Sequence, residues 1–150
     1  MSWLLLVALL AGAPPSADGR ATVPGAVNPR VTQANIASTI CVSGWTKTIR
    51  PTAAYTNKLK FAALKRAGVP RSQAPAYELD HDVPLDLGGA PSAPVNLWLQ
   101  PYAGAVNARQ KDRLENALHR MVCARKLSLI AAQREISLDW VAAYRQRFGW

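Results

Sequence analysis

Residues 78 to 89 concentrate the side chains of this chain that can do acid–base and metal chemistry. The segment reads Glu-Leu-Asp-His-Asp-Val-Pro-Leu-Asp-Leu-Gly-Gly and holds Glu78, Asp80, Asp82 and Asp86, four of the nine acidic residues in the chain. The chain as a whole carries 18 Lys and Arg and a formal charge of +9. Such an excess favours a polyanionic partner, nucleic acid first and an anionic membrane surface second. A tight acidic cluster in a basic chain therefore predicts a bound cation.

Asp80 and His81 together offer the two functions that phosphodiester hydrolysis needs. A base must make water nucleophilic, and a cation must stabilise the charge that develops on phosphate and leaving oxygen. Adjacent side chains on a strand point to opposite faces, so the two residues need local distortion to serve one site. Pro84 and Gly88-Gly89 favour that distortion.

A longer pattern surrounds this pair: Asp80-His81-x-x-Pro84-Leu85-x-x-Gly88-Gly89, followed by Asn96-Leu97. It resembles the signature of the HNH endonucleases, over about a fifth of the chain. The resemblance implies a ββα-metal fold, in which two strands and a helix close over one divalent ion. By position it implies that His81 is the general base, that Asp80 is a metal ligand, and that Asn96 holds the hairpin loop and orients the imidazole.

The last element of the signature is a His or Asn at the start of the helix, with a Lys shortly after. Asn107 and Lys111 match it best, although three residues separate them where two are more usual. The resemblance implies that Asn107 is the second metal ligand. Lys111, with Arg109 and Arg113, is predicted to bind flanking phosphates.

A rival ligand set lies on the same predicted helix. Asp112, Glu115 and His119 are spaced i, i+3 and i+7 and form one polar stripe, which is either a second half of the metal site or a solvent-facing row of charges. The expected cofactor is a divalent ion, Mg²⁺ first, with Mn²⁺, Ca²⁺ and Zn²⁺ left open.

Periodicity and turn residues predict an α+β, mostly helical fold in which a short β-hairpin supports the signature. Tyr77 to His81 alternates as a strand and Asn96 to Leu99 is its return strand, placing His81 near Asn96. The predicted helices cover residues 32–40, 56–68 and 107–125, with two closing helices capped by Ser128 and Ser137; residues 45–51 and 69–76 are predicted to be irregular.

The amino-terminal residues and the two cysteines predict the compartment in which the protein is found. Residues 1–17 have the apolar core of a signal peptide, residues 18–31 are predicted to be an extended arm, and residues 32–150 to form a single nuclease-like domain. An exported protein, secreted or periplasmic, would oxidise its two cysteines, so a Cys41–Cys123 disulfide is predicted, with two buried free thiols as the alternative. No stable membrane association is expected once the signal is removed.

The function expected from these residues is metal-dependent hydrolysis of DNA, or of RNA, with weak sequence specificity, because no base-reading element is visible. One alternative is a basic secreted protein that binds nucleic acid through an inactive HNH fold. A third is a structural or adhesive domain in which the acidic cluster holds calcium.

Overall fold

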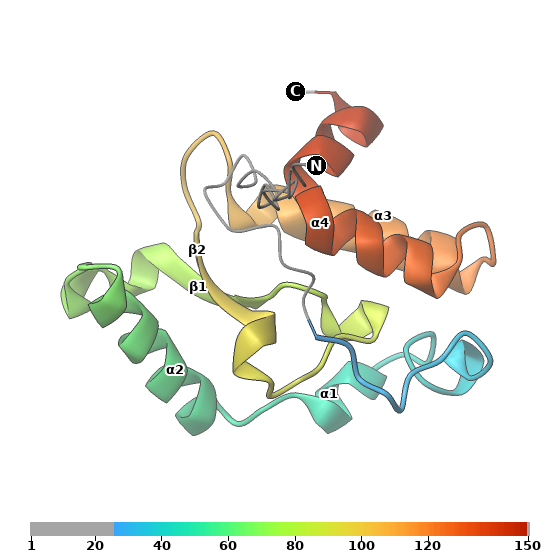
Figure 1. Cartoon of the computed structure of the whole chain (residues 1–150), viewed down its shortest axis with the longest axis horizontal. Coiled ribbons are helices and arrows are strands. Elements are labelled where there is room, and N and C mark those ends of the chain that lie inside the picture. Colours follow the sequence, from blue (N-terminus) through green and yellow to red (C-terminus); the bar gives the residue numbers. More distant parts are fainter. Residues whose placement is uncertain (1–25, 150) are drawn as a thin grey trace, which may run out of the picture.

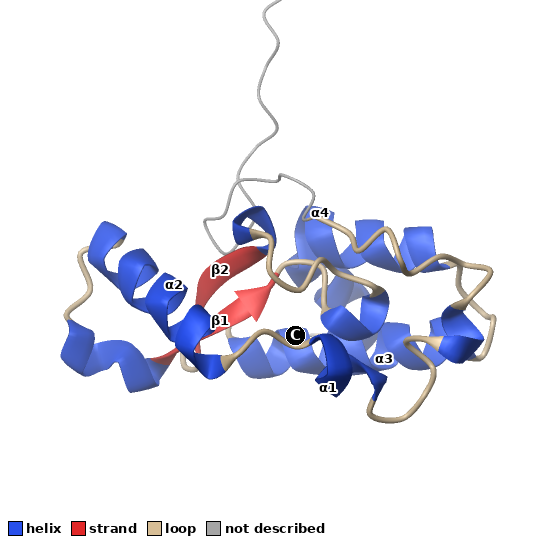
Figure 2. Ribbon diagram, turned by 90° about the horizontal axis from the view of Figure 1, so that it is seen from below, coloured by secondary structure: helices blue, strands red, loops and turns tan. Residues whose placement is uncertain are grey.

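This computed structural model describes residues 26–149, and those residues form an α+β fold that is mostly helical. In chain order the helices and strands are α1 (Trp45–Ile49), α2 (Ala53–Arg66), β1 (Tyr77–His81), β2 (Leu97–Pro101), α3 (Ala108–Cys123) and α4 (Leu129–Phe148), with 3-10 turns η1 (Ile36–Ser38), η2 (Arg71–Ala76), η3 (Leu85–Leu87) and η4 (Pro94–Asn96). Figures 1 and 2 show the hairpin between α2 on one side and the α3–α4 pair on the other. The α+β, mostly helical class and the short β-hairpin are as predicted. The predicted signal peptide and most of the predicted arm lie outside the described residues.

The hairpin is antiparallel, with Asp80 opposite Trp98 and His81 opposite Leu97. Asn96 holds the long loop between the two strands. Its fully buried amide accepts from the backbone N–H of Val83 at 2.9 Å and donates to the carbonyls of Val83 and Ala90, both at 3.0 Å. The predicted hairpin is therefore confirmed, and a single side chain fixes the path of the chain that follows His81.

The two glycines of the signature are required by the backbone of this loop. A Cβ on Gly89 would lie 1.7 Å from the carbonyl oxygen of Val83, and Gly88 has a φ of +75°. Residues at the start of the described chain pair with the same turn, through a bridge between Val27 and Gly89 and a 2.8 Å bond from the N–H of Asn28 to the carbonyl of Gly88. The predicted arm therefore ends earlier than residue 31, because its last residues are part of the fold.

Helix α3 packs through a buried apolar stripe of Leu114, Leu118 and Val122 against α4. Ser128 caps α4 as predicted, accepting a hydrogen bond from the N–H of Ala131. The second predicted cap, Ser137, is wrong. The helix breaks instead at Asp139 (φ −155°, ψ 81°), whose side chain accepts from Ala142 at 3.0 Å.

Further elements before the hairpin differ from the prediction. Residues 32–40 are turns with only a short 3-10 segment, because Asn35 engages the local backbone: its Oδ1 accepts from the N–H of Thr32 and its carbonyl from the hydroxyl of Thr39. Residues predicted to be irregular form α1 and η2. Helix α2 starts at Ala53 rather than at residue 56, because the cap is Thr52.

The predicted disulfide is present. Cys41 and Cys123 are bonded with a Cα–Cα distance of 5.6 Å, which ties the turns after η1 to the last residue of α3. Between residues 26 and 149, no helix is both long and apolar enough to cross a bilayer.

Candidate metal and catalytic site at the end of the hairpin

Two cavities meet at His81. The smaller one, about 120 Å³, is lined by Arg50, Glu78, Leu79, Asp80, His81, Pro84, Leu85, Asp112 and Glu115. The larger one, about 380 Å³, lies between the hairpin and α2. Both are lined by Arg50, Glu78, Leu79 and His81. The imidazole thus lies at the border between an acidic cavity and a groove along α2.

The orientation of His81 suits a base. Its Nε2 lies 2.9 Å from the carbonyl oxygen of Pro91, and because a carbonyl only accepts, Nε2 carries the proton and Nδ1 keeps its lone pair. Burial lowers the pKa of His81, and the nearby cations Arg50 and Lys111 act in the same direction, against the effects of Pro91 and Asp80. The ring is therefore neutral at pH 7, the form that can accept a proton. The imidazole is therefore oriented by the backbone carbonyl of Pro91, whereas Asn96, predicted to orient it, bonds the backbone of the loop.

Lys111 has a different place from the one predicted. Its side chain is fully buried, and Nζ donates to Asp80 Oδ2 at 2.6 Å and to the carbonyl of His81 at 2.7 Å. A buried ammonium with these partners does not reach a flanking phosphate, which corrects the predicted phosphate-binding role. Lys111 instead joins α3 to the end of β1 and fixes the position of Asp80.

Asn107 is also used otherwise than predicted. It caps α3 in a capping box, since its Oδ1 accepts from the N–H of Gln110 and its Nδ2 donates to the carbonyl of Gly104. It lines neither of the two cavities at His81. Asp112 and Glu115, two residues of the rival ligand set, line the small cavity together with Asp80.

The acidic groups of this site raise one another's pKa. Burial is the largest cause for Glu78, Asp112 and Glu115, and the charge of Asp80 adds to it in each case. The rise is large for Glu115, which lies beside the carboxylate of Asp86. A bound cation would favour the ionised forms of all these carboxylates.

The donor set fits one class of ion better than others. The cavity offers carboxylate oxygens, the ligands of hard cations such as Mg²⁺. Within residues 26–149, no three of these carboxylates bring oxygens within 4.8 Å of one another. That spacing does not suit an all-protein cage, but Mg²⁺ commonly takes one or two carboxylates and completes its shell with water and substrate phosphate.

A second group of potential ligands lies at the disulfide. Cys41, His119 and Cys123 have ligand atoms within 4.8 Å of one another, and His119 Nε2 is 2.9 Å from the carbonyl of Ile40. Because the two sulfurs are bonded to each other, this group could hold a metal ion only after reduction. His119, the third member of the rival stripe, therefore lies at the disulfide and lines neither cavity at His81, although its Nδ1 is 4.0 Å from Asp86 Oδ2.

The two predicted phosphate-binding arginines, Arg109 and Arg113, have different surroundings. The Arg113 guanidinium donates to the Tyr144 hydroxyl and lies 4.1 Å from the centroid of the Phe148 ring, so it is directed toward α4. Arg109 is exposed on the first turn of α3. Arg50, which lines both cavities, was missed, because a single arginine between two short helical segments has no spacing that marks it.

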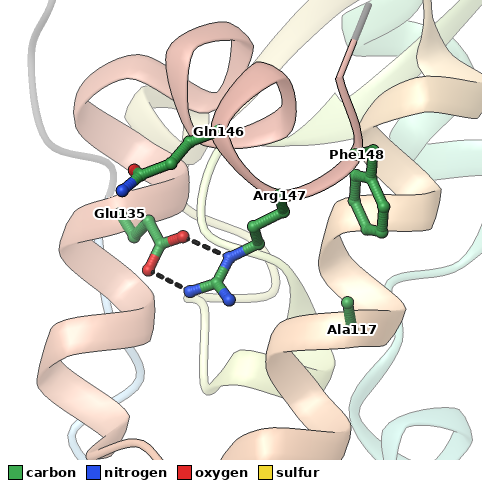
Figure 3. A pocket seen from close by; sticks show the side chains of 5 residues that line it. All are labelled: Ala117, Glu135, Gln146, Arg147 and Phe148. Atoms are coloured by element: carbon green, nitrogen blue, oxygen red, sulfur yellow. Dashed lines mark hydrogen bonds and ion pairs between the residues drawn. The ribbon is translucent and has the colours of Figure 1, made fainter.

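Another cavity, about 500 Å³, lies away from this chemistry, between α3 and the end of α4. Figure 3 shows that Arg147 and Glu135 form a two-pronged ion pair across it. Ala117, Gln146 and Phe148 complete the lining. It offers no base beside an ion site, so the catalytic candidate remains the pair of cavities at His81.

Comparison with protein-family models, curated proteins and solved structures finds no match to this chain.

Proposed function

We propose that this protein is a metal-dependent endonuclease of the HNH type that hydrolyses phosphodiester bonds in DNA, or in RNA, with weak sequence specificity. The observation that carries the proposal is the position of His81. Its ring is neutral, its Nε2 is held by Pro91, and it lies between an oxygen-lined acidic cavity and a groove with basic residues. In this proposal β1, β2 and α3 are the two strands and the helix of a ββα-metal core.

Each residue of the candidate site has a specific role in the proposed hydrolysis. His81 takes a proton from water at Nδ1, and Asp80 with Glu115 or Asp112 would hold a divalent ion, Mg²⁺ first. When bound, that ion would stabilise charge on the phosphate and the leaving oxygen. Lys111 is a positioning residue for Asp80, and Arg50 binds the phosphate because it borders both cavities.

A plasmid-nicking assay tests the proposal, with His119 as the matched control because the chain has two histidines. With Mg²⁺ the wild-type protein should nick plasmid and EDTA should stop it. His81→Ala should lower the rate by about 10²-fold or more, the contribution of a general base. His119→Gln should keep most of the activity once its folding is confirmed by circular dichroism. Intact plasmid with the wild type, or equal cutting by His81→Ala, would overturn the proposal.

A second function is favoured by one contact, the ion pair that Lys111 makes with Asp80 Oδ2. An ammonium in that place neutralises a carboxylate that the metal would use. In this alternative the chain binds nucleic acid through an inactive HNH fold, and its retention of DNA is sensitive to salt but indifferent to EDTA and to His81→Ala. The disulfide agrees with either function in an oxidising compartment, secreted or periplasmic.

A further inference from the structure

The groove between α2 and the hairpin has one wall made by a single face of α2. Ala53, Thr56, Asn57 and Lys60 line it, at the i, i+3, i+4 and i+7 spacing of one helical face. The opposite wall comes from the hairpin and includes Tyr102, directly after β2. Figure 1 shows α2 running beside the two strands. His81 is part of the same lining.

The lining of the groove is mixed in charge. Lys60 and Arg50 supply positive charge and Glu78 a carboxylate, and both Arg50 and Glu78 also line the small cavity. Thr56 and Asn57 add neutral hydrogen-bonding groups. Tyr102 is 41% exposed and offers an aromatic ring. Positive charge, neutral donors and an exposed ring are the features with which proteins hold single-stranded nucleic acid.

The size of the groove limits what enters it. About 380 Å³ between a helix and a hairpin is at the lower end of the range for small-ligand sites. It suits about one nucleotide of an unpaired strand. A duplex, whose bases are stacked and paired inside, would have to release a nucleotide before it could fill the same space.

We propose that this groove binds single-stranded nucleic acid on one side of the scissile phosphate, with Arg50 and Lys60 on phosphates and Tyr102 against a base. This inference rests on the proposed function, because only the nuclease reaction defines which phosphate is the scissile one. It adds a substrate preference for unpaired strands, and it adds residues of α2 that the HNH resemblance does not include.

The test compares two lysines of the same helix. Lys60 lines the groove, whereas Lys58 is exposed and about 160° away around the helix axis. Binding of a fluorescein-labelled 12-nucleotide single strand of DNA is measured by anisotropy at low salt in the full-length His81→Ala protein, which separates binding from cleavage. Lys60→Gln should weaken binding about fivefold or more, and Lys58→Gln, with the same change in charge, should stay within about twofold.

Two further arms sharpen the comparison. The same oligonucleotide as a blunt duplex should bind more weakly than the single strand, and Tyr102→Ala should weaken single-strand binding while Tyr102→Phe should not. An oligoribonucleotide of the same sequence shows whether RNA shares the groove. Equal effects of Lys60→Gln and Lys58→Gln, or duplex binding as tight as that of the single strand, would overturn the inference.

The outcome of this test is separate from that of the nicking assay. If the wild-type protein leaves plasmid intact but the contrast between Lys60 and Lys58 holds, the groove is a binding site and the nuclease proposal fails. If plasmid is nicked but the two lysines behave alike, the nuclease proposal stands and the substrate lies elsewhere.

Discussion

Replacing Lys111 by methionine tests the buried contact that joins α3 to the candidate site. Methionine nearly matches the length of the lysine stem, so little cavity is created. What is lost is the charge, which leaves the Asp80 side chain, 12% exposed, and the carbonyl of His81 without their donor at 2.6 and 2.7 Å. Removing one member of a buried ion pair costs about 3 to 5 kcal/mol. For a domain of this size that corresponds to a fall in Tm of roughly 15 °C.

The assay is urea and thermal unfolding followed by circular dichroism on four proteins: wild type, Lys111→Met, Asp80→Asn and the double variant. Because the two side chains act on each other, the double variant should be more stable than the sum of the single losses predicts, by about 1 to 3 kcal/mol. Lys58→Met, at an exposed position on α2, is the control and should change stability by less than about 0.5 kcal/mol.

A different result would refute this reasoning. If Lys111→Met costs no more than Lys58→Met, the ammonium is not buried against Asp80 in solution. A coupling near zero in the double variant would lead to the same conclusion. In either case Lys111 would again be a candidate for binding phosphate, and the role of Asp80 would have to be reconsidered.

Three other predictions follow from single features of the structure. Gly89→Ala places a methyl group 1.7 Å from a backbone carbonyl oxygen and should lower the free energy of unfolding by about 3 kcal/mol or more. Gly44→Ala, with a φ of +80° but nothing within 4 Å, should lower it by about 1 to 2 kcal/mol. Equal losses of the two variants in urea unfolding would contradict this reasoning. Because burial raises the pKa of Glu115, the folded protein binds this proton more tightly than the unfolded chain, and its stability falls as pH rises above the ordinary value of 4.5. Glu115→Gln should therefore stabilise the metal-free protein at pH 7 but not below pH 4.5, and should reduce the rise in Tm that Mg²⁺ gives the wild type; a pH-independent effect would refute this cause. Loss of the disulfide in Cys41→Ser/Cys123→Ser should cost about 4 to 5 kcal/mol, since the bond closes a loop across a sequence separation of 82, and an unchanged denaturation midpoint would show that the bond adds little.

The parts of the site that are local in sequence could be predicted from it. Alternation and turn residues identified the strand that ends at His81 and its return after Asn96, because hairpin pairing involves residues close along the chain. The pairing of Cys41 with Cys123 followed from there being two cysteines and an expected oxidising environment. The HNH resemblance directed attention to Asp80 and His81, and both line the small cavity.

The residues of α3 that reach the candidate site could not be predicted from the sequence, because they depend on how the helix packs. Asn107 caps the predicted helix and Lys111 lies within it, but the rotation of α3 about its axis decides which of its side chains reach β1. That rotation is set by the apolar stripe packed on α4, and it buries Lys111 against Asp80 and directs Asp112 and Glu115 into the cavity.

The sequence by itself therefore determined which segment contributes Asp80 and His81 to the candidate site, through the types and local spacing of residues 78 to 96. Only the tertiary structure decided which distant residues complete it, such as Arg50 and the face of α2 that carries Lys60. The physical reason is that hairpins and helical periodicity arise from contacts a few residues apart. Burial, pKa and the shape of a cavity come from elements that meet only after the chain has folded.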